Sequence, residues 1–161
     1  MNKQTIQLDY EVYTSIDELT EKDKILLQSA RNTTAQAYAP YSHFLVGAVA
    51  LLQNGATVAG ANQENASFPV GVCAERTLLG AAAMSYQGIP ITTMAIAYHN
   101  LNGGSDRPVS PCGMCRQAIH EYENRTHQPI RLILSGMEGA VYIIEHASHL
   151  LPLSFDGSQL R

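Results

Sequence analysis

The chain has 161 residues, of which 45% are apolar and 15% are charged. This length predicts a single domain spanning residues 1–161, and the composition excludes a disordered or low-complexity chain. The formal net charge of −4 argues against broad attraction to nucleic acid or to anionic lipid, so we expect a small ligand, no nucleic-acid partner and no membrane partner.

The N-terminus and the cysteines predict the cellular compartment of the chain. The polar start MNKQTIQLDYE lacks the apolar core of a signal peptide, and no apolar run approaches the roughly 20 residues that cross a bilayer. The three cysteines cannot all pair with one another, and a reducing compartment keeps them as thiols. We therefore expect a cytoplasmic protein.

The first third of the chain predicts a strand, a helix and a hairpin. Apolar and polar residues alternate over residues 4–12, which indicates a peripheral strand inside an N-terminal extension, residues 1–20, of unknown role. Thr20, followed three places on by an aspartate, indicates a helix start, and Pro40 predicts the end of that helix near residue 39. Asn54-Gly55 then predicts a hairpin turn between strands at 45–52 and 57–61.

The rest of the chain alternates between helical and strand patterns. Helices are predicted over residues 73–86 and 112–122, and strands over 94–98, 131–135 and 140–144. The predicted fold is α/β, a three-layer αβα sandwich around a five-stranded mixed sheet, with the extension added at its edge.

Three cysteines stand at predicted helix starts. Cys112 and Cys115 lie three apart, which places both sulfurs on one face of a first helical turn, and Cys73 stands at the start of the earlier helix. Helix N-termini favour thiolates, and three thiolates favour a zinc ion whose fourth position stays open for water. Read alone, the Cys112–Cys115 pair equally fits a redox pair or a structural zinc knuckle.

Glu75 favours catalysis over these alternatives. It follows Cys73 by two residues, and Pro111 directly precedes Cys112. A cysteine, one residue, a glutamate, and later Pro-Cys-x-x-Cys form a three-cysteine version of the zinc deaminase signature, in which the glutamate moves protons without binding the metal.

Around these residues the chain resembles the small zinc-dependent cytidine deaminases of pyrimidine salvage. The resemblance covers about Tyr38 to Leu160 in five ordered blocks: YAPYSHFLVGA, NQENASF, CAERT, SPCGMCRQ and LLPLSF. It implies a cytidine deaminase-like fold, zinc bound by the three cysteines, and Glu75 as the general acid and base.

The resemblance also implies substrate contacts. It places Asn62 and Glu64 on the ribose hydroxyls, Phe44 against the base, and the backbone near Ala74 on the base as well. It further implies a homotetramer in which Phe155 enters the pocket of a neighbouring subunit. In isolation, Phe44 and Phe155 are more typical of core residues.

Arg76 is expected to offset the negative charge of such a site. Three thiolates around a dication leave a net charge of −1, and a neighbouring guanidinium that donates to sulfur restores the electrophilicity of the metal. The expected reaction has Glu75 take a proton from the zinc-activated water, which attacks C4 of the pyrimidine, and then pass protons to N3 and to the departing amine.

Three other functions remain open from the sequence. An aminohydrolase for another aminated ring is the nearest, although a ribose clamp at Asn62 and Glu64 would be unnecessary for a free base. A zinc-stapled interaction module without catalysis is the second. Editing of RNA or DNA fits poorly with the net charge of −4.

Overall fold

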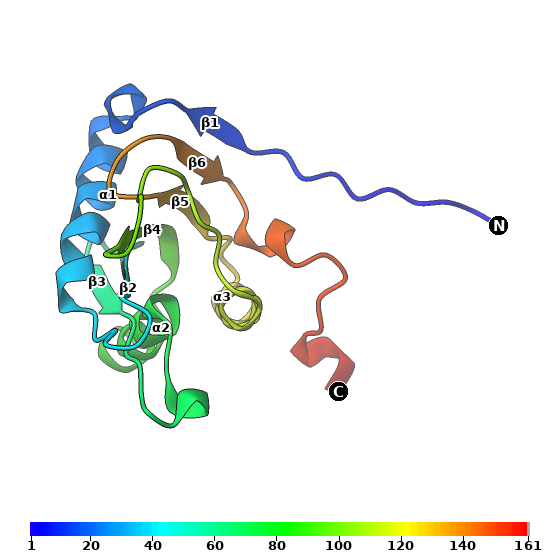
Figure 1. The fold of residues 1–161 in the computed structure, drawn as a ribbon. Coiled ribbons are helices and arrows are strands. Elements are labelled where there is room, and N and C mark those ends of the chain that lie inside the picture. The colour runs from blue at the N-terminus through cyan, green and yellow to red at the C-terminus, as the bar shows by residue number, and fades with distance from the viewer. Residues whose placement is uncertain (161) are drawn as a thin grey trace.

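Six strands form one mixed sheet in the computed structural model, which describes residues 1–160 (Figure 1). Their order across the sheet is β1-β6-β5-β4-β2-β3. The strands are β1 (Glu11–Tyr13), β2 (Phe44–Leu52), β3 (Thr57–Ala61), β4 (Ile91–Asn100), β5 (Arg131–Ser135) and β6 (Val141–Ile144). Only β4 and β5 are parallel, so the predicted mixed α/β sheet is confirmed, with six strands instead of five.

Helices cover both faces of this sheet. Helix α1 (Glu21–Thr33) packs on one face, and α2 (Ala74–Ser85) with α3 (Gly113–Thr126) packs on the other (Figure 1). Alternate residues of β2 follow this division, since Ala48 and Ala50 join the core under α2 and α3 while Val49 joins the core under α1. Short 3₁₀ helices complete the fold: η1 (Ile16–Glu18), η2 (Thr34–Gln36), η3 (Phe68–Val70), η4 (Ala147–Leu150) and η5 (Gly157–Leu160).

The predicted strand at residues 4–12 is wrong over most of its length. Strand β1 pairs with β6 only from Glu11 to Tyr13, and the residues before it are extended, exposed and outside the sheet (Figure 1). The register sets Glu11 opposite Ile143, and β6 ends one residue later. The preceding residues therefore have no neighbouring strand to pair with.

Helix α1 begins as predicted and ends earlier than predicted. The Thr20 hydroxyl accepts a hydrogen bond from the backbone N–H of Asp23 at 3.3 Å, which caps the helix. The α-helix ends at Thr33, well before Pro40. The backbone of Tyr38 instead bonds to that of residues 62 and 64, and this pairing is incompatible with a continued helix.

Strand β4 is twice as long as the predicted 94–98 segment. It pairs with β2 from Ile91 to Asn100, and this pairing extends the strand beyond the apolar segment at both ends. The predicted hairpin between β2 and β3 is confirmed, with Gly55 at φ +86° in the turn. None of the helices within residues 1–160 is both long enough and apolar enough to span a membrane.

Candidate active site

The three cysteine sulfurs meet where the N-termini of α2 and α3 converge. The Sγ atoms of Cys73 and Cys112 are 3.7 Å apart, and those of Cys112 and Cys115 are 3.4 Å apart. Zn–S bonds of about 2.3 Å in a tetrahedron predict S···S separations of roughly 3.8 Å, which these distances approach. No fourth histidine, cysteine or acidic residue of the described chain joins this cluster. The donor set therefore fits zinc with one open position.

The local sequence explains why the sulfurs are free to act as ligands. Cys73 and Cys112 occupy the N-cap positions of α2 and α3, and neither side chain makes a capping hydrogen bond. Cys115 lies in the first turn of α3 and is buried. A Cβ at position 60 would lie 2.5 Å from the carbonyl oxygen of Ala74, so Gly60 of β3 allows the start of α2 to pack against the sheet.

The thiols are strongly coupled to one another. Hydrogen bonds from the thiols of Cys115 and Cys112 and the positive charge of Arg76 outweigh desolvation and lower the pKa of Cys73 to about 6. The pKa of Cys115 is raised, because its thiol donates to Cys73 and because it is buried. Cys73 is thus readily a thiolate, the form that binds a metal.

Glu75 is buried beside this cluster. Its exposed fraction is 4%, and burial raises the pKa of its carboxyl group. It lies in the first turn of α2, close enough to Cys115 for a side-chain interaction with that thiol. A carboxyl group whose pKa moves toward neutrality is suited to exchanging protons at physiological pH.

Arg76 differs from the sequence-based expectation. Its side chain is exposed, and within residues 1–160 no hydrogen bond joins it to a sulfur. Its charge does lower the pKa of Cys73. Arg116, in the SPCGMCRQ block, was not predicted as a site residue; its guanidinium donates to the carbonyl oxygens of Pro111 at 2.8 Å and Leu150 at 3.0 Å. Arg116 thereby holds the loop that carries Cys112.

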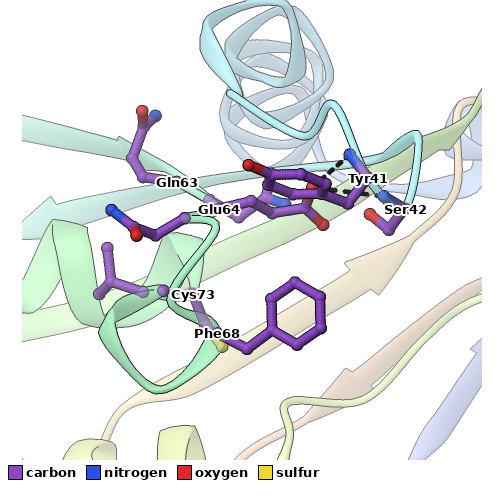
Figure 2. A pocket seen from close by; sticks show the side chains of 10 residues that line it. Tyr41, Ser42, Gln63, Glu64, Phe68 and Cys73 are labelled. Atoms are coloured by element: carbon purple, nitrogen blue, oxygen red, sulfur yellow. Dashed lines mark hydrogen bonds between the residues drawn. The ribbon is translucent and has the colours of Figure 1, made fainter.

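A cavity of ≈ 510 Å³ opens next to Cys73. Its wall includes Asn62 and Glu64, and Figure 2 shows Tyr41, Glu64, Phe68 and Cys73 around it. Its volume is within the range of about 300–1,000 Å³ that is usual for small-molecule sites.

The loop between β3 and α2 forms one side of this cavity. The backbone groups of Gln63 and Val72 exchange hydrogen bonds at 2.9 and 3.0 Å, which closes the loop on itself. The same loop bonds to Tyr38, whose backbone accepts from Glu64 at 2.8 Å. These contacts bring the NxEN segment over Cys73.

The side-chain amide of Asn62 binds the backbone at the start of β2. Its Oδ1 accepts from the backbone N–H of Val46 at 2.7 Å, and its Nδ2 donates to the carbonyl oxygen of Phe44 at 2.9 Å. The side chain is therefore a rigid link between β3 and β2. Its Nδ2 carries a second hydrogen that this pairing does not use.

Glu64 is held as a carboxylate at the rim of the cavity. Its Oε2 accepts from the backbone N–H groups of Tyr41 at 2.9 Å and Ser42 at 3.3 Å (Figure 2). The hydroxyl of Ser42, these two N–H groups and the nearby His43 keep the pKa of Glu64 below its ordinary value. One carboxylate oxygen is thus engaged with the backbone, and the group can accept further hydrogen bonds through the other.

The remaining predicted contacts lie at different depths. Phe44 is half-buried and stacks on Tyr98, with ring centroids 4.8 Å apart and planes at 11°. Ala74 is fully buried at the start of α2. Phe155 is 58% exposed and lines a separate cavity with Arg76, away from Asn62 and Glu64.

Two aromatic residues at the cavity were not predicted from the sequence. Tyr41 and Phe68 are 51% and 75% exposed and form an edge-on pair with ring centroids 5.9 Å apart. Tyr41 lies in the YAPYSHFLVGA block and Phe68 in the NQENASF block, so the motifs themselves marked both residues as candidates. Their convergence depends on the folding of the loop between β3 and α2.

Comparisons with known proteins agree with this geometry. Residues 20–128 match the family described as the cytidine and deoxycytidylate deaminase zinc-binding region. A cytidine deaminase of Halalkalibacterium halodurans is 34% identical over 85% of this chain and 96% of its own length. One of Sporosarcina psychrophila is 32% identical over 84% of this chain and 92% of its own length.

Solved structures give the same result. A cytidine deaminase structure from Burkholderia pseudomallei has a TM-score of 0.70 and 34% identity. The match covers 85% of this chain and 100% of that one. One from Mycobacterium tuberculosis has a TM-score of 0.62 and 27% identity, covering 84% and 98% of the two chains. The resemblance stated from the motifs is confirmed: the chain belongs to the cytidine and deoxycytidylate deaminase family and is an enzyme with a zinc cofactor.

Proposed function

We propose that this chain hydrolyses cytidine, and also deoxycytidine, to uridine or deoxyuridine and ammonia in pyrimidine salvage. The observation that carries the proposal is the meeting of three sulfurs at zinc-like separations beside the buried Glu75. The relatives that cover most of this chain are named cytidine deaminases, which supports the same substrate.

In the proposed site, Cys73, Cys112 and Cys115 hold zinc. The ion supplies a Lewis acid that lowers the pKa of a coordinated water toward neutrality. Glu75 would carry both protons of the attacking water: it accepts the first and delivers it to the pyrimidine N3, then takes the second from the new C4 hydroxyl and delivers it to the amino group, which leaves as ammonia. Arg76 assists through its charge, which already favours the Cys73 thiolate.

The nucleoside is bound by residues around the cavity beside Cys73. Glu64 accepts from a ribose hydroxyl while its other oxygen stays on the backbone of residues 41 and 42. Asn62 offers its remaining N–H to the sugar, and Phe44 and the backbone of Ala74 contact the base. A bare base would give no partner to the second Nδ2 hydrogen of Asn62 or to the second carboxylate oxygen of Glu64, so the site favours nucleosides.

The oligomer and the compartment belong to the same proposal. The chain acts as one catalytic domain in a homotetramer, and Phe155 contributes to the pocket of a neighbouring subunit. The exposed position of Phe155 away from its own cavity supports this arrangement. Three thiols kept as metal ligands suit a reducing compartment, so we place the enzyme in the cytoplasm.

Loss of cytidine absorbance with purified protein tests the function. We expect turnover of cytidine and deoxycytidine, loss of turnover after chelation and recovery on adding zinc. Cytosine and adenosine are the matched comparison substrates. Turnover of cytosine but not of cytidine would support the rival aminohydrolase, and zinc-loaded protein without turnover of any of these would support a non-catalytic zinc module.

A further inference from the structure

The C-terminal segment beyond η4 lies beside helix α3 and packs loosely against it. A cavity of ≈ 740 Å³ separates residues 155–160 from α3, lined from the helix by Met114 and Gln117 and from the segment by Phe155. The side chain of Leu153 is 94% exposed and that of Phe155 is 58% exposed. Apolar packing therefore contributes little to holding Phe155 in place.

Two side chains of α3 bind this segment directly. Gln117 donates from Nε2 to the carbonyl oxygen of Phe155 at 3.0 Å. Three residues further along the helix, Nε2 of His120 lies 2.9 Å from the hydroxyl of Ser154. Residues three apart lie on one face of a helix, so both contacts reach the segment from the same side.

The backbone before these contacts is bent at an energetic cost. Leu153 has φ +56°, the left-handed conformation that residues other than glycine rarely adopt. Its exposed side chain gains nothing from this conformation. Such a conformation persists only where the surroundings determine it, and the bonds at Ser154 and Phe155 are the neighbouring constraints.

His120 contacts two further side chains of α3, the exposed Asn124 and the buried Glu123. The amide Nδ2 of Asn124 lies 3.1 Å from Nε2 of His120, and Oε2 of Glu123 lies 4.0 Å from its Nδ1. Glu123 is fixed in turn, since its Oε1 accepts from the backbone N–H of Ile130 at 2.8 Å. Because an amide nitrogen can only donate, the Asn124 contact makes Nε2 of His120 an acceptor, and this atom also accepts from the Ser154 hydroxyl.

We propose that Gln117 and His120 are positioning residues that hold the C-terminal segment in the conformation that presents Phe155 to the site of a neighbouring copy of the chain. The inference rests on the proposed role of Phe155 in trans. It adds that the helix carrying Cys115 also sets the geometry of the neighbour's pocket. Neither residue touches the reacting atoms, so both act on substrate binding more than on the chemical step.

The first test separates KM from kcat. Gln117→Leu keeps the size of the side chain but cannot donate, and we expect KM for cytidine to rise about three- to tenfold, the equivalent of one hydrogen bond, with kcat within about twofold. Ser154→Ala should behave alike, and Ser154→Thr should restore the wild-type KM because it keeps the hydroxyl. Gln28→Leu, the same change at an exposed position of α1, should leave KM unchanged.

A double-variant cycle tests whether Gln117 affects KM through Phe155. In a Phe155→Ala background, Gln117→Leu should produce no further rise in KM, because the residue it positions is gone. An additive rise would overturn the proposal, as would an unchanged KM in the single variants. Ser154→Ala removes a single oxygen atom and provides the same test if Gln117→Leu does not fold.

A second readout does not depend on deamination. Chymotryptic cleavage after Phe155, followed by intact mass, should be faster in Gln117→Leu and Ser154→Ala than in the wild type and in Gln28→Leu. Equal cleavage rates in all four proteins would overturn the proposal. Wild-type protein that does not deaminate cytidine would instead refute the proposed function, and the cleavage rates would still report on the segment.

Discussion

The sulfur atoms of Cys73 and Cys112 lie 3.7 Å apart although 39 positions separate them in the chain. Each residue is the N-cap of a helix, and both helices pack on the same face of the sheet. The two helix starts therefore direct their partial positive charges at one point, where thiolates are stabilised. The cavity with Asn62 and Glu64 opens at this same point.

Glu75→Gln should abolish proton transfer while leaving the metal cluster intact. The amide has the same shape as the carboxylate but cannot accept and return a proton, so we expect kcat to fall by about 10²–10⁴-fold. Zinc content by atomic emission and the thermal unfolding midpoint serve as controls and should match the wild type. A variant that retains most of its kcat would show that Glu75 is not the proton carrier.

Asn62→Ala should affect both stability and substrate binding. It removes the hydrogen bonds to Val46 and Phe44, so two backbone groups at the start of β2 lose those partners. We expect the free energy of unfolding to fall by about 1–3 kcal/mol, measured by urea denaturation, together with a higher KM. Asn54→Ala, in the hairpin turn where Oδ1 accepts one exposed backbone bond, is the comparison and should cost less. Equal losses in the two variants would contradict the linking role of Asn62.

Mixed oligomers should show whether Phe155 acts between subunits. Phe155→Ala alone should raise KM, and Glu75→Gln alone should be inactive. In a co-assembled mixture, a chain with Glu75 intact receives Phe155 from its neighbour, so a population of sites should regain the low wild-type KM. Kinetics that remain those of Phe155→Ala, diluted by inactive chains, would place the action of Phe155 within its own subunit.

Glu123→Gln should stabilise the protein by an amount that depends on pH. Burial raises the pKa of Glu123 in the folded chain, against opposing effects of the Ile130 backbone N–H, His120 and His146. The contribution of this carboxyl group to the free energy of unfolding is fully present below about pH 4.3, its pKa in the unfolded chain. It is lost as the pH rises through the higher pKa of the folded chain, because the buried group must then ionise. The glutamine keeps an acceptor for the Ile130 N–H without ionising.

The gain in unfolding free energy from Glu123→Gln should therefore be larger at pH 7 than at pH 4, in parallel urea titrations. The exposed Glu121→Gln on the same helix is the matched control, and its effect should vary little over this range. A gain that is equal at both pH values would contradict the raised pKa of Glu123.

Several features of this protein were determined by local sequence alone. Strand β3 (57–61) and strand β5 (131–135) have the predicted bounds, because short apolar runs between turn residues define them. The spacing of Cys112 and Cys115 also predicted that their two sulfurs lie together, since a helix start fixes the direction of its first side chains. These features depend on interactions between residues close in the chain.

Other features were decided only by the tertiary structure. The length of β6 limits β1 to three residues, the pairing of Tyr38 ends α1 early, and β2 extends β4 at both ends. The same holds for the amide bonds of Asn62, the exposed position of Arg76 and the contact of His120 with Ser154. Each of these depends on a partner distant in sequence, and neither periodicity nor local propensity contains the identity of that partner.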